Sequence, residues 1–320
     1  MKMTNNTLTA ISGFRVGHVT HLEGATGCTV ILPPEGTIGG VDVRGGGPGT
    51  RETDLLNPVN HVEQVHAIVL AGGSAFGLAA ADGVMQYLAE NGIGYKSIPG
   101  FTIPIVPAAI LFDLNLGAPD VRPDAAMGYE ACSAATDEPV QQGTVGAGTG
   151  ATVGKLLGME FATKGGLGSA AIDLGDDLIV AALAAVNAVG DVIAEDGSIL
   201  AGVRQPPDGK GFMGALNAFK QYVQMGVNGD NTVIGVVATN ARLSKAHVTK
   251  VAQMAHDGLA RAINPAHTMH DGDTIFALAT GEIPANPSVI GAFAAEAFAM
   301  AIRNGVRHAQ SLAGVRAYNE

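Results

Sequence analysis

The chain has 320 residues, 47% of them hydrophobic, and a formal net charge of −11. A chain of this length can bury a large core, as one large domain or two intimate ones. The negative charge argues against nucleic-acid binding, which needs Lys and Arg contacts to phosphates. Because there are 45 glycines and only 5% aromatic residues, we expect closely packed layers and tight turns.

The N-terminal segment and the cysteines indicate a soluble cytoplasmic protein. The segment MKMTNNTLTAISGF has no long apolar core of the kind found in secretory signals. We also find no run of about 18 uncharged apolar residues that predicts a membrane span. Cys28 and Cys132 are too few for a disulfide framework and stand in apolar surroundings, so we expect buried free thiols.

In the first half of the chain, apolar runs bounded by glycines predict three strands and one glycine-rich turn: strands at 26–32, 39–44 and 66–73, and the turn GGGPGTRE at 45–52. Helical spacing of apolar residues predicts a helix over 74–92, with Ser74 as the N-cap and Gly92 as its end. Residues 104–114 are apolar but broken by prolines, which is typical of an edge strand. A short helix is predicted over 123–137.

The second half begins with a Gly/Thr/Ala region and continues with alternating strands and helices. The patterns predict paired strands at 165–174 and 176–194, a long connection at 201–231 with one helix near 212–224, strands at 233–239 and 274–280, and helices at 244–263 and 287–304. Ser244 suits an N-cap. Strands thus come in runs with helices between the groups, which favours an α+β fold with packed sheets inside and helices outside.

The junction between Asn231 and Thr232 is the first candidate for chemistry. A polar, glycine-rich stretch, MGVNGDN, ends there, and the apolar, β-branched run VIGVVAT begins. A threonine at such a junction suits backbone self-cleavage, in which its hydroxyl attacks the preceding carbonyl. The freed Thr232 then carries a nucleophile and, in its own α-amine, a proton acceptor. The same dipeptide also occurs as an ordinary loop-to-strand connection, so the pattern alone leaves both interpretations open.

Two polar residues in small-residue or apolar surroundings are candidates to assist this nucleophile. Lys155 is the only charged residue between Gly143 and Leu157. It is either a surface lysine at a strand end or a cation that lowers the pKa of the nucleophile and stabilises negative charge. Asn187 lies in the apolar run AALAAVNAVG, where a buried amide needs partners. It either satisfies backbone groups or serves as an oxyanion donor.

A third candidate is the acidic pair in the segment HTMHDGDT. Asp271 and Asp273 precede a predicted strand, so they either form a simple turn or orient Thr232 and hold its charged amine. His267 and His270 in the same segment suggest a metal site. Their spacing fits neither the HExxH pattern nor the twelve-residue calcium loop, and we therefore predict no metal.

The glycine-rich segment GAGTGA (146–151) matches the loose GxGxxG pattern of dinucleotide-binding proteins. That pattern requires a strand, a turn and a helix in succession, and no helix is evident here. The glycines are more typical of tight backbone packing beside a pocket, where their N–H groups can also face an oxyanion. We therefore predict no cofactor, with a nucleotide-dependent enzyme as an alternative.

Several long motifs in the same order give the chain a family resemblance. It resembles the self-processing L-aminopeptidase/D-esterase and β-aminopeptidase family, which also contains the nylon-oligomer (6-aminohexanoate oligomer) hydrolases. The likeness covers nearly the whole chain and rests on seven segments: DVRGGGPGTRETDLL (42–56), AIVLAGGSAFGLAAADGV (67–84), IPIVPAAILFDL (103–114), VGAGTGATVGK (145–155), AAVNAVGD (184–191), NTVIGVVATNARLSKA (231–246) and HDGDTIFALAT (270–280).

The resemblance implies a fold and a site. The family fold is a four-layer αββα sandwich, similar to that of N-terminal-nucleophile hydrolases but with different connectivity. Family precursors cut themselves before a Ser or Thr, and both chains stay together. Here cleavage of the single hydrolase domain, 1–320, gives an α chain, 1–231, and a β chain, 232–320, with Thr232 as the nucleophile. Four supporting residues carry over by motif: Lys155, Asn187, Asp271 and Asp273.

The details lean toward the nylon-hydrolase branch, with one departure. Thr rather than Ser at the cleavage point, Asn before it and DGDT after it are similar to that branch. The branch has Tyr where this chain has Phe76 in GGSAFGL, so any hydroxyl contact from that position is lost. The resemblance does not fix the substrate, and aminopeptidase, esterase and endo-amidase activities all remain open.

We therefore expect an autoprocessed amide hydrolase that acts through an acyl-enzyme on Thr232. The expected substrate is a small amide or peptide, and the expected assembly is a homotetramer of αβ units with no nucleic-acid or membrane partner and no cofactor. The alternative is an uncleaved, non-catalytic small-molecule-binding protein on the same scaffold.

Overall fold

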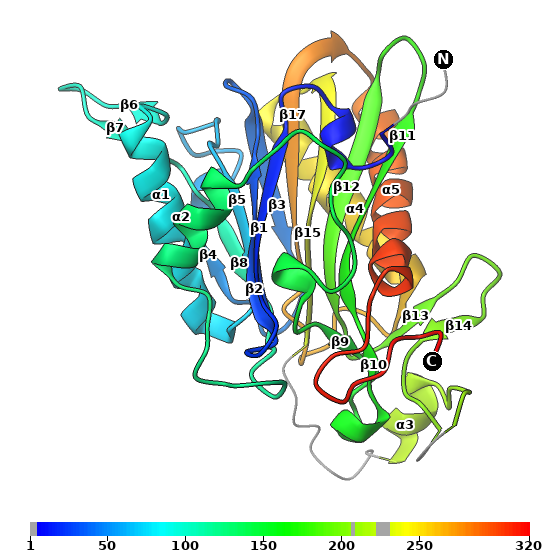
Figure 1. Ribbon diagram of the computed structural model, residues 1–320. Helices are drawn as coiled ribbons and strands as arrows, with labels where there is room; N and C mark the ends of the chain where they lie inside the picture. Colours follow the sequence, from blue (N-terminus) through cyan, green and yellow to red (C-terminus); the bar gives the residue numbers. More distant parts are fainter. Residues whose placement is uncertain (1–4, 206–208, 222–230) are drawn as a thin grey trace.

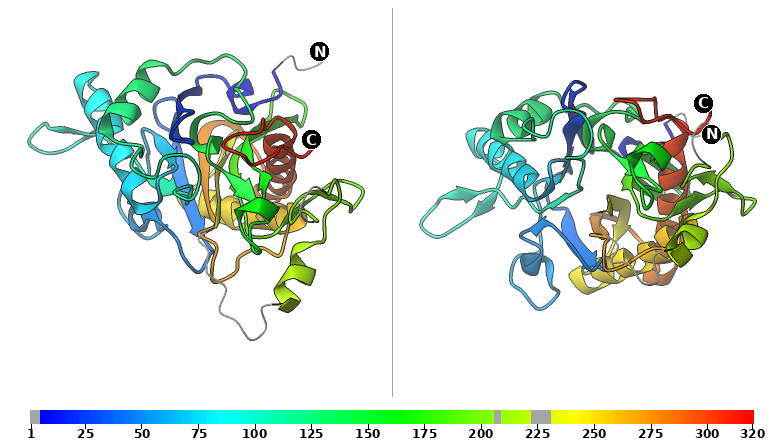
Figure 2. Two further views of the ribbon diagram at one scale, coloured as in Figure 1. Left: turned by 60° about the horizontal axis from the view of Figure 1, so that its bottom comes forward. Right: turned by 90° about the horizontal axis from the view of Figure 1, so that it is seen from below.

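The computed structural model describes residues 5–205, 209–221 and 231–320. Two five-stranded sheets lie face to face, and a pair of helices covers the outer face of each (Figures 1 and 2). This arrangement confirms the predicted α+β fold with four αββα layers. The chain passes from the first sheet to the second and back, so each sheet contains strands from distant parts of the sequence.

The first sheet contains five strands in the order β1-β2-β5-β8-β4, with bounds Arg15–His21, Thr26–Leu32, Ile68–Ala71, Ala108–Ile110 and Thr50–Arg51. Helices α1 (Ala80–Glu90) and α2 (Ala125–Ser133) pack against its outer face. Both cysteines, Cys28 and Cys132, are buried free thiols in this layer, as predicted.

The second sheet has the order β11-β12-β15-β17-β3, with bounds Gly166–Asp173, Ile179–Asn187, Thr232–Arg242, Thr274–Pro284 and Ile38–Val43. Its neighbouring strands are antiparallel except for β15 and β17, which run parallel and are connected through α4 (Lys245–Ala262). Helices α4 and α5 (Pro287–Arg307) cover its outer face. The predicted strand pair is confirmed as β11 and β12, but the second strand ends at Asn187 and not at 194, because residues Asp191–Ile193 form β13 in a separate sheet.

The smaller elements border these layers. Two strand pairs are β6 (Tyr95–Lys96) with β7 (Thr102–Ile103) and β9 (Thr152–Val153) with β10 (Thr163–Lys164), and a third small sheet contains β13 (Asp191–Ile193), β14 (Ile199–Ala201) and β16 (Ile263–Asn264). The short helix α3 spans Ala215–Gln221. The 3₁₀ turns of the described residues are η1 (Leu8–Ala10), η2 (Asp54–Leu56), η3 (Ser74–Ala79), η4 (Gly146–Gly148) and η5 (Met159–Phe161). Helix α3 confirms a helix in the long connection, and the last part of the predicted helix, 222–224, lies outside the described residues.

Three apolar layers hold the sandwich together, one between the sheets and one under each helix pair. Strand β15 contributes to two of them because alternate residues face opposite sides. Ile234 and Val236 lie between the sheets, while Val233 and Val237 face α4 and α5. At Gly235 a Cβ atom would lie 2.5 Å from the Phe298 ring, so glycine there lets α5 approach the strand.

The helix ends follow the local sequence. Ser244 caps α4 by accepting a hydrogen bond from the His247 N–H at 3.3 Å, as predicted. The prediction of one helix over 74–92 with Ser74 as N-cap is wrong. Residues 74–79 form the 3₁₀ turn η3, Ser74 has φ +54° and no capping bond, and the α-helix begins at Ala80. The tighter turn brings Gly77 against the Gly72 carbonyl, where a Cβ atom would lie 1.9 Å away.

The proline-broken segment 104–114 is not an edge strand. Its strand, β8, lies inside the first sheet between β5 and β4. The prolines precede the hydrogen-bonded residues, and the Pro107 carbonyl accepts a bond from Val69 at 3.0 Å. Because no proline N–H is needed within β8 itself, the prolines do not exclude an interior position.

Helix α5 is the one helix among the described residues that is long and apolar enough to cross a membrane. We expected no such segment because the sequence has no long run of uncharged apolar residues. Helix α5 does not form such a run, since it contains the charged residues Glu296 and Arg303. In the fold, 67% of its most apolar window is buried, because α5 packs on β11, β12 and α4. It is therefore a core helix of the sandwich.

Candidate active site

Thr232 is the first residue of β15, the central strand of the second sheet (Figure 1). It is 4% exposed and has the same orientation as Ile234, so its side chain points into the layer between the sheets. Asn187, the last residue of β12, pairs directly with it across the ladder. The Cβ atoms of such partners lie about 5 Å apart on the same face. Strand register thus brings these two predicted site residues together.

The peptide bond between Asn231 and Thr232 is held by the loop before β17. The Asn231 N–H donates to the His270 carbonyl at 2.8 Å, and the Asn231 carbonyl accepts from the Gly272 N–H at 2.8 Å. The Thr232 hydroxyl donates to the same carbonyl oxygen. The Thr232 hydroxyl therefore lies against the carbonyl at the predicted cleavage point, and a backbone donor polarises the carbonyl oxygen.

The half-buried Lys155 joins the site through Asn187. Its ammonium donates to Asn187 Oδ1 at 2.7 Å and to the Thr152 carbonyl at 2.9 Å. Asn187 Oδ1 also accepts from the Thr152 N–H at 3.0 Å, and Asn187 Nδ2 donates to the Phe112 carbonyl at 2.9 Å. Two donors face the oxygen and one acceptor faces the nitrogen, so the network fixes the orientation of the amide. The Phe112 carbonyl accepts one of the two amide hydrogens of Asn187.

Asp273 contacts strand β15 from the other face of the sheet. Its Oδ1 accepts from the Val233 N–H at 2.8 Å. Its Oδ2 accepts from the His267 N–H at 3.1 Å and from His267 Nδ1 at 2.8 Å. Asp273 therefore fixes the backbone immediately after Thr232.

Asp271 lies at the same junction but has different partners. Its Oδ2 accepts from the Thr268 hydroxyl at 2.6 Å and from the Thr268 N–H at 2.9 Å. Burial, and next the charge of Asp273, raise the pKa of Asp271 to about 6. Asp271 also forms a parallel bridge with Asn231. The parallel pairing of β15 and β17 thus places the acidic pair beside the predicted cleavage point.

The sequence matches peptidase family S58 over residues 6–319. This chain belongs to that family. It is 44% identical to a Mycobacterium tuberculosis protein named as an uncharacterized aminopeptidase, covering 98% of this chain and 97% of the relative. It is 34% identical to the 6-aminohexanoate-oligomer endohydrolase of Paenarthrobacter ureafaciens, covering 85% of this chain and 74% of that enzyme. The chain is therefore a hydrolase of amide bonds, as the sequence predicts.

Solved structures give the same fold. A β-aminopeptidase from a Burkholderia species superposes with a TM-score of 0.72 at 23% identity, covering 98% of this chain and 90% of that one. The L-aminopeptidase D-Ala-esterase/amidase of Ochrobactrum anthropi, described as a variant of the Ntn-hydrolase fold, gives 0.73 at 20% identity with the same coverage. These likenesses support the αββα architecture of this S58 peptidase.

The glycine-rich turn, for which the residues alone predicted no role at the site, packs on the acidic loop of this S58 peptidase. The Gly47 N–H donates to the Asp271 carbonyl at 2.9 Å, and the Gly45 N–H donates to the Asp273 carbonyl at 3.3 Å. A Cβ atom on Gly45 would lie 2.1 Å from the Asp271 carbonyl oxygen. The contact therefore requires glycine, and the run of three glycines is the sequence signal that was available.

Lys164, which was not among the predicted site residues, is a fully buried lysine. Its ammonium donates to the carbonyls of Gly148, Ala151 and Gly165 at 3.1, 2.7 and 3.1 Å. Burial lowers its pKa to about 7. Lys164 thereby holds the turn that precedes Thr152, a partner of both Lys155 and Asn187. Like Lys155, it is an isolated charge among small residues, and this was the available signal.

The glycine pattern at 146–151 is used for close packing. Turn η4 is followed by the short strand β9, and a Cβ atom on Gly146 would lie 2.2 Å from the Thr29 hydroxyl. This arrangement differs from the strand, turn and helix of a dinucleotide site. Over residues 5–205, 209–221 and 231–320, no group of three or more His, Cys, Asp or Glu side chains is placed to hold a metal.

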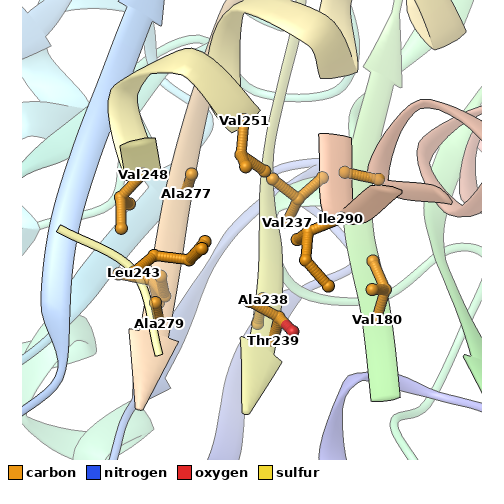
Figure 3. Close-up of a pocket in the computed structure, with 12 residues that line it drawn as sticks. Val180, Val237, Ala238, Thr239, Leu243, Val248, Val251, Ala277, Ala279 and Ile290 are labelled. Carbon is orange, nitrogen blue, oxygen red and sulfur yellow. The ribbon is translucent and has the colours of Figure 1, made fainter. Parts of the chain in front are cut away.

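Two further features of the chain have no contact in common with Thr232 among the hydrogen bonds described above. Phe76, where the nylon-hydrolase motif has Tyr, is 57% exposed, and the Arg122 guanidinium lies 3.9 Å from its ring centroid. Figure 3 shows aliphatic side chains between the second sheet and helices α4 and α5. The space that they enclose does not admit a water molecule, so this region serves packing; its lining includes Val180, Val237, Leu243, Val248, Ala277 and Ile290.

Proposed function

We propose that this S58 peptidase cuts its backbone between Asn231 and Thr232 and then hydrolyses amide bonds with Thr232 as an N-terminal nucleophile. The observation that carries the proposal is the contact between the Thr232 hydroxyl and the Asn231 carbonyl oxygen, which also accepts the Gly272 N–H. The hydroxyl and the carbonyl group that would react are therefore neighbours in the folded chain, which favours attack. The products are the chains 1–231 and 232–320.

Self-cleavage begins when Thr232 Oγ1 forms a bond to the Asn231 carbonyl carbon. The Gly272 N–H stabilises the oxyanion that develops on the carbonyl oxygen. The bond between this carbon and the Thr232 nitrogen then breaks, and the hydroxyl proton passes to the leaving nitrogen. Water hydrolyses the resulting ester, which leaves a carboxylate on Asn231 and restores the Thr232 hydroxyl beside a free amine.

Turnover repeats this chemistry on a substrate amide. The α-amine of Thr232, or Lys155, accepts the hydroxyl proton and transfers it to the leaving amine, and water then hydrolyses the acyl-enzyme. The second amide hydrogen of Asn187 and the Gly272 N–H serve as oxyanion donors, and one such donor typically contributes about 3 kcal/mol. Asp273 fixes the strand behind Thr232, and Asp271 supplies negative charge beside its amine.

The substrate class is a small amide or peptide. The mycobacterial relatives named as aminopeptidases share more identical residues with this chain than the oligomer endohydrolases do, 44% against 34%. This difference favours release of N-terminal residues from short peptides over cleavage of nylon-type oligomers. A panel of L-amino acid amides, β-amino acid amides and 6-aminohexanoate oligomers distinguishes the activities by their relative kcat/KM.

We also propose a cytoplasmic homotetramer of αβ units. The β6–β7 hairpin projects from the sandwich (Figure 1), with Ile98 fully exposed and Phe101 67% exposed at its tip. These exposed apolar side chains are the surface that we expect another subunit to cover. Light scattering of the purified protein, which gives its mass in solution, tests the assembly.

A denaturing gel with intact-mass measurement tests the central proposal. We expect two chains from the wild type, the smaller beginning Thr-Val-Ile-Gly, and the same two chains from Thr232→Ser. We expect one inactive 32.3 kDa chain from Thr232→Ala. An active wild-type preparation that contains only the 32.3 kDa species contradicts self-cleavage. An intact wild type that binds small amides without hydrolysing them supports the binding-protein alternative.

A further inference from the structure

Two histidines lie behind the acidic loop, on the face of the second sheet opposite the Thr232 side chain. Val233, whose side chain faces the α4–α5 layer, donates its N–H to Asp273 Oδ1 at 2.8 Å. The other oxygen of this carboxylate is held by His267 through both its N–H, at 3.1 Å, and its Nδ1, at 2.8 Å. Asp273 therefore connects His267 to the residue that follows the nucleophile.

The backbone of His267 suits this double contact. Its φ of +57° lies in the left-handed region, which residues other than glycine adopt uncommonly, although asparagine, aspartate and histidine do so more often than most. In this conformation the N–H and the ring nitrogen converge on one oxygen. Because a carboxylate oxygen accepts, Nδ1 must carry the proton of this hydrogen bond.

Helix α4 supports the His267 ring from the other side. His256 packs edge-on against it with ring centroids 4.8 Å apart, and His256 Nε2 lies 3.0 Å from the Asp42 carbonyl oxygen. Burial lowers the pKa of His256 to about 4, so this ring is neutral at pH 7. Asp42 and its ion-pair partner Arg44 are the nearest charges on this side. In the described parts of the chain, His267 Nε2 has no hydrogen-bond partner, so the polar contacts of the ring run to Asp273.

We infer that His267 is a positioning residue for Thr232 that acts through Asp273. By occupying Asp273 Oδ2, it keeps Oδ1 on the Val233 N–H and so fixes the start of the strand at the nucleophile. The catalytic part of this inference rests on the proposed function of Thr232. The mechanical part, which is the anchoring of Val233, holds whether or not the chain is cleaved.

Two substitutions separate the hydrogen bond from the unusual backbone. Asparagine and glycine both adopt the left-handed region readily. His267→Asn places an amide N–H near the position of Nδ1, whereas His267→Gly has no side-chain donor. His61→Gly, at an exposed loop histidine, is the matched control.

The first measurement is hydrogen exchange of the Val233 amide in a Thr232→Ala background, where no variant is cleaved. We expect exchange at least about tenfold faster in His267→Gly, as for a lost charge-assisted hydrogen bond, and near-original exchange in His267→Asn and His61→Gly. Equal protection in all variants with an unchanged melting temperature overturns the anchoring role.

The second measurement is the rate of chain cleavage with Thr232 present. We expect His267→Gly to cleave at least about tenfold more slowly than the wild type and His267→Asn to recover most of the rate. If the wild type cleaves and all variants match it, the positioning role is wrong while the proposed function stands. If the wild type is never cleaved, the proposed function fails, and the exchange measurement alone decides the anchoring of Val233.

Discussion

Asp271 is a buried carboxyl beside a second carboxyl, so its replacement by asparagine has an effect on stability that depends on pH. Burial and Asp273 raise its pKa from 3.8 to about 6 in the folded protein. Between these values the folded state binds more protons than the unfolded state, so the Asp271 contribution to stability is lost as pH rises. A shift of about two pKa units corresponds to about 3 kcal/mol. The asparagine side chain of the variant does not ionise, so the variant escapes this loss.

The assay compares the unfolding free energies of Thr232→Ala and Thr232→Ala/Asp271→Asn, so that cleavage does not intervene. The chain has no tryptophan, and denaturant unfolding is therefore followed by circular dichroism. From pH 4 to pH 7 the difference, asparagine minus aspartate, should rise by about 2 kcal/mol, since part of the full effect lies below pH 4. Asp120→Asn, at an exposed position, should give a flat difference. A difference for Asp271→Asn that is flat or falls with pH refutes the reasoning.

Three further substitutions test the contacts around Thr232. Gly272→Ala places a Cβ atom 2.9 Å from Thr232 Oγ1 and should slow self-cleavage on a timed gel, whereas Gly47→Ala, with its nearest contact at 3.8 Å, should not. Lys155→Met should slow turnover by about 100-fold, while the exposed Lys250→Met leaves it unchanged; equal rates would contradict a catalytic role of Lys155. Lys164→Met removes the partner of three buried carbonyls and should lower the unfolding free energy by about 3 kcal/mol; an unchanged denaturation midpoint would contradict its structural role.

Much of the secondary structure was predictable because its causes are local. The cap at Ser244 and the paired strands β11 and β12 follow from neighbouring residues and were predicted correctly. The 3₁₀ turn at 74–79 was not predicted, because the apolar spacing of these residues also fits an α-helix and does not show the close approach of Gly77 to the Gly72 carbonyl. The interior position of β8 was missed because it depends on which strands pair with it.

Some features of the candidate site were predictable from the sequence, and others were not. The sequence by itself determined the fold family and the residue types: a threonine before an apolar strand, an isolated lysine and a pair of aspartates. Only the tertiary structure decided that Asn187 lies opposite Thr232, that Gly45 packs on the acidic loop and that Asp273 is held by His267. These contacts depend on strand register and on backbone approach between distant segments. The register and the backbone approach are set only when the layers pack, so the residues of one segment alone do not determine them.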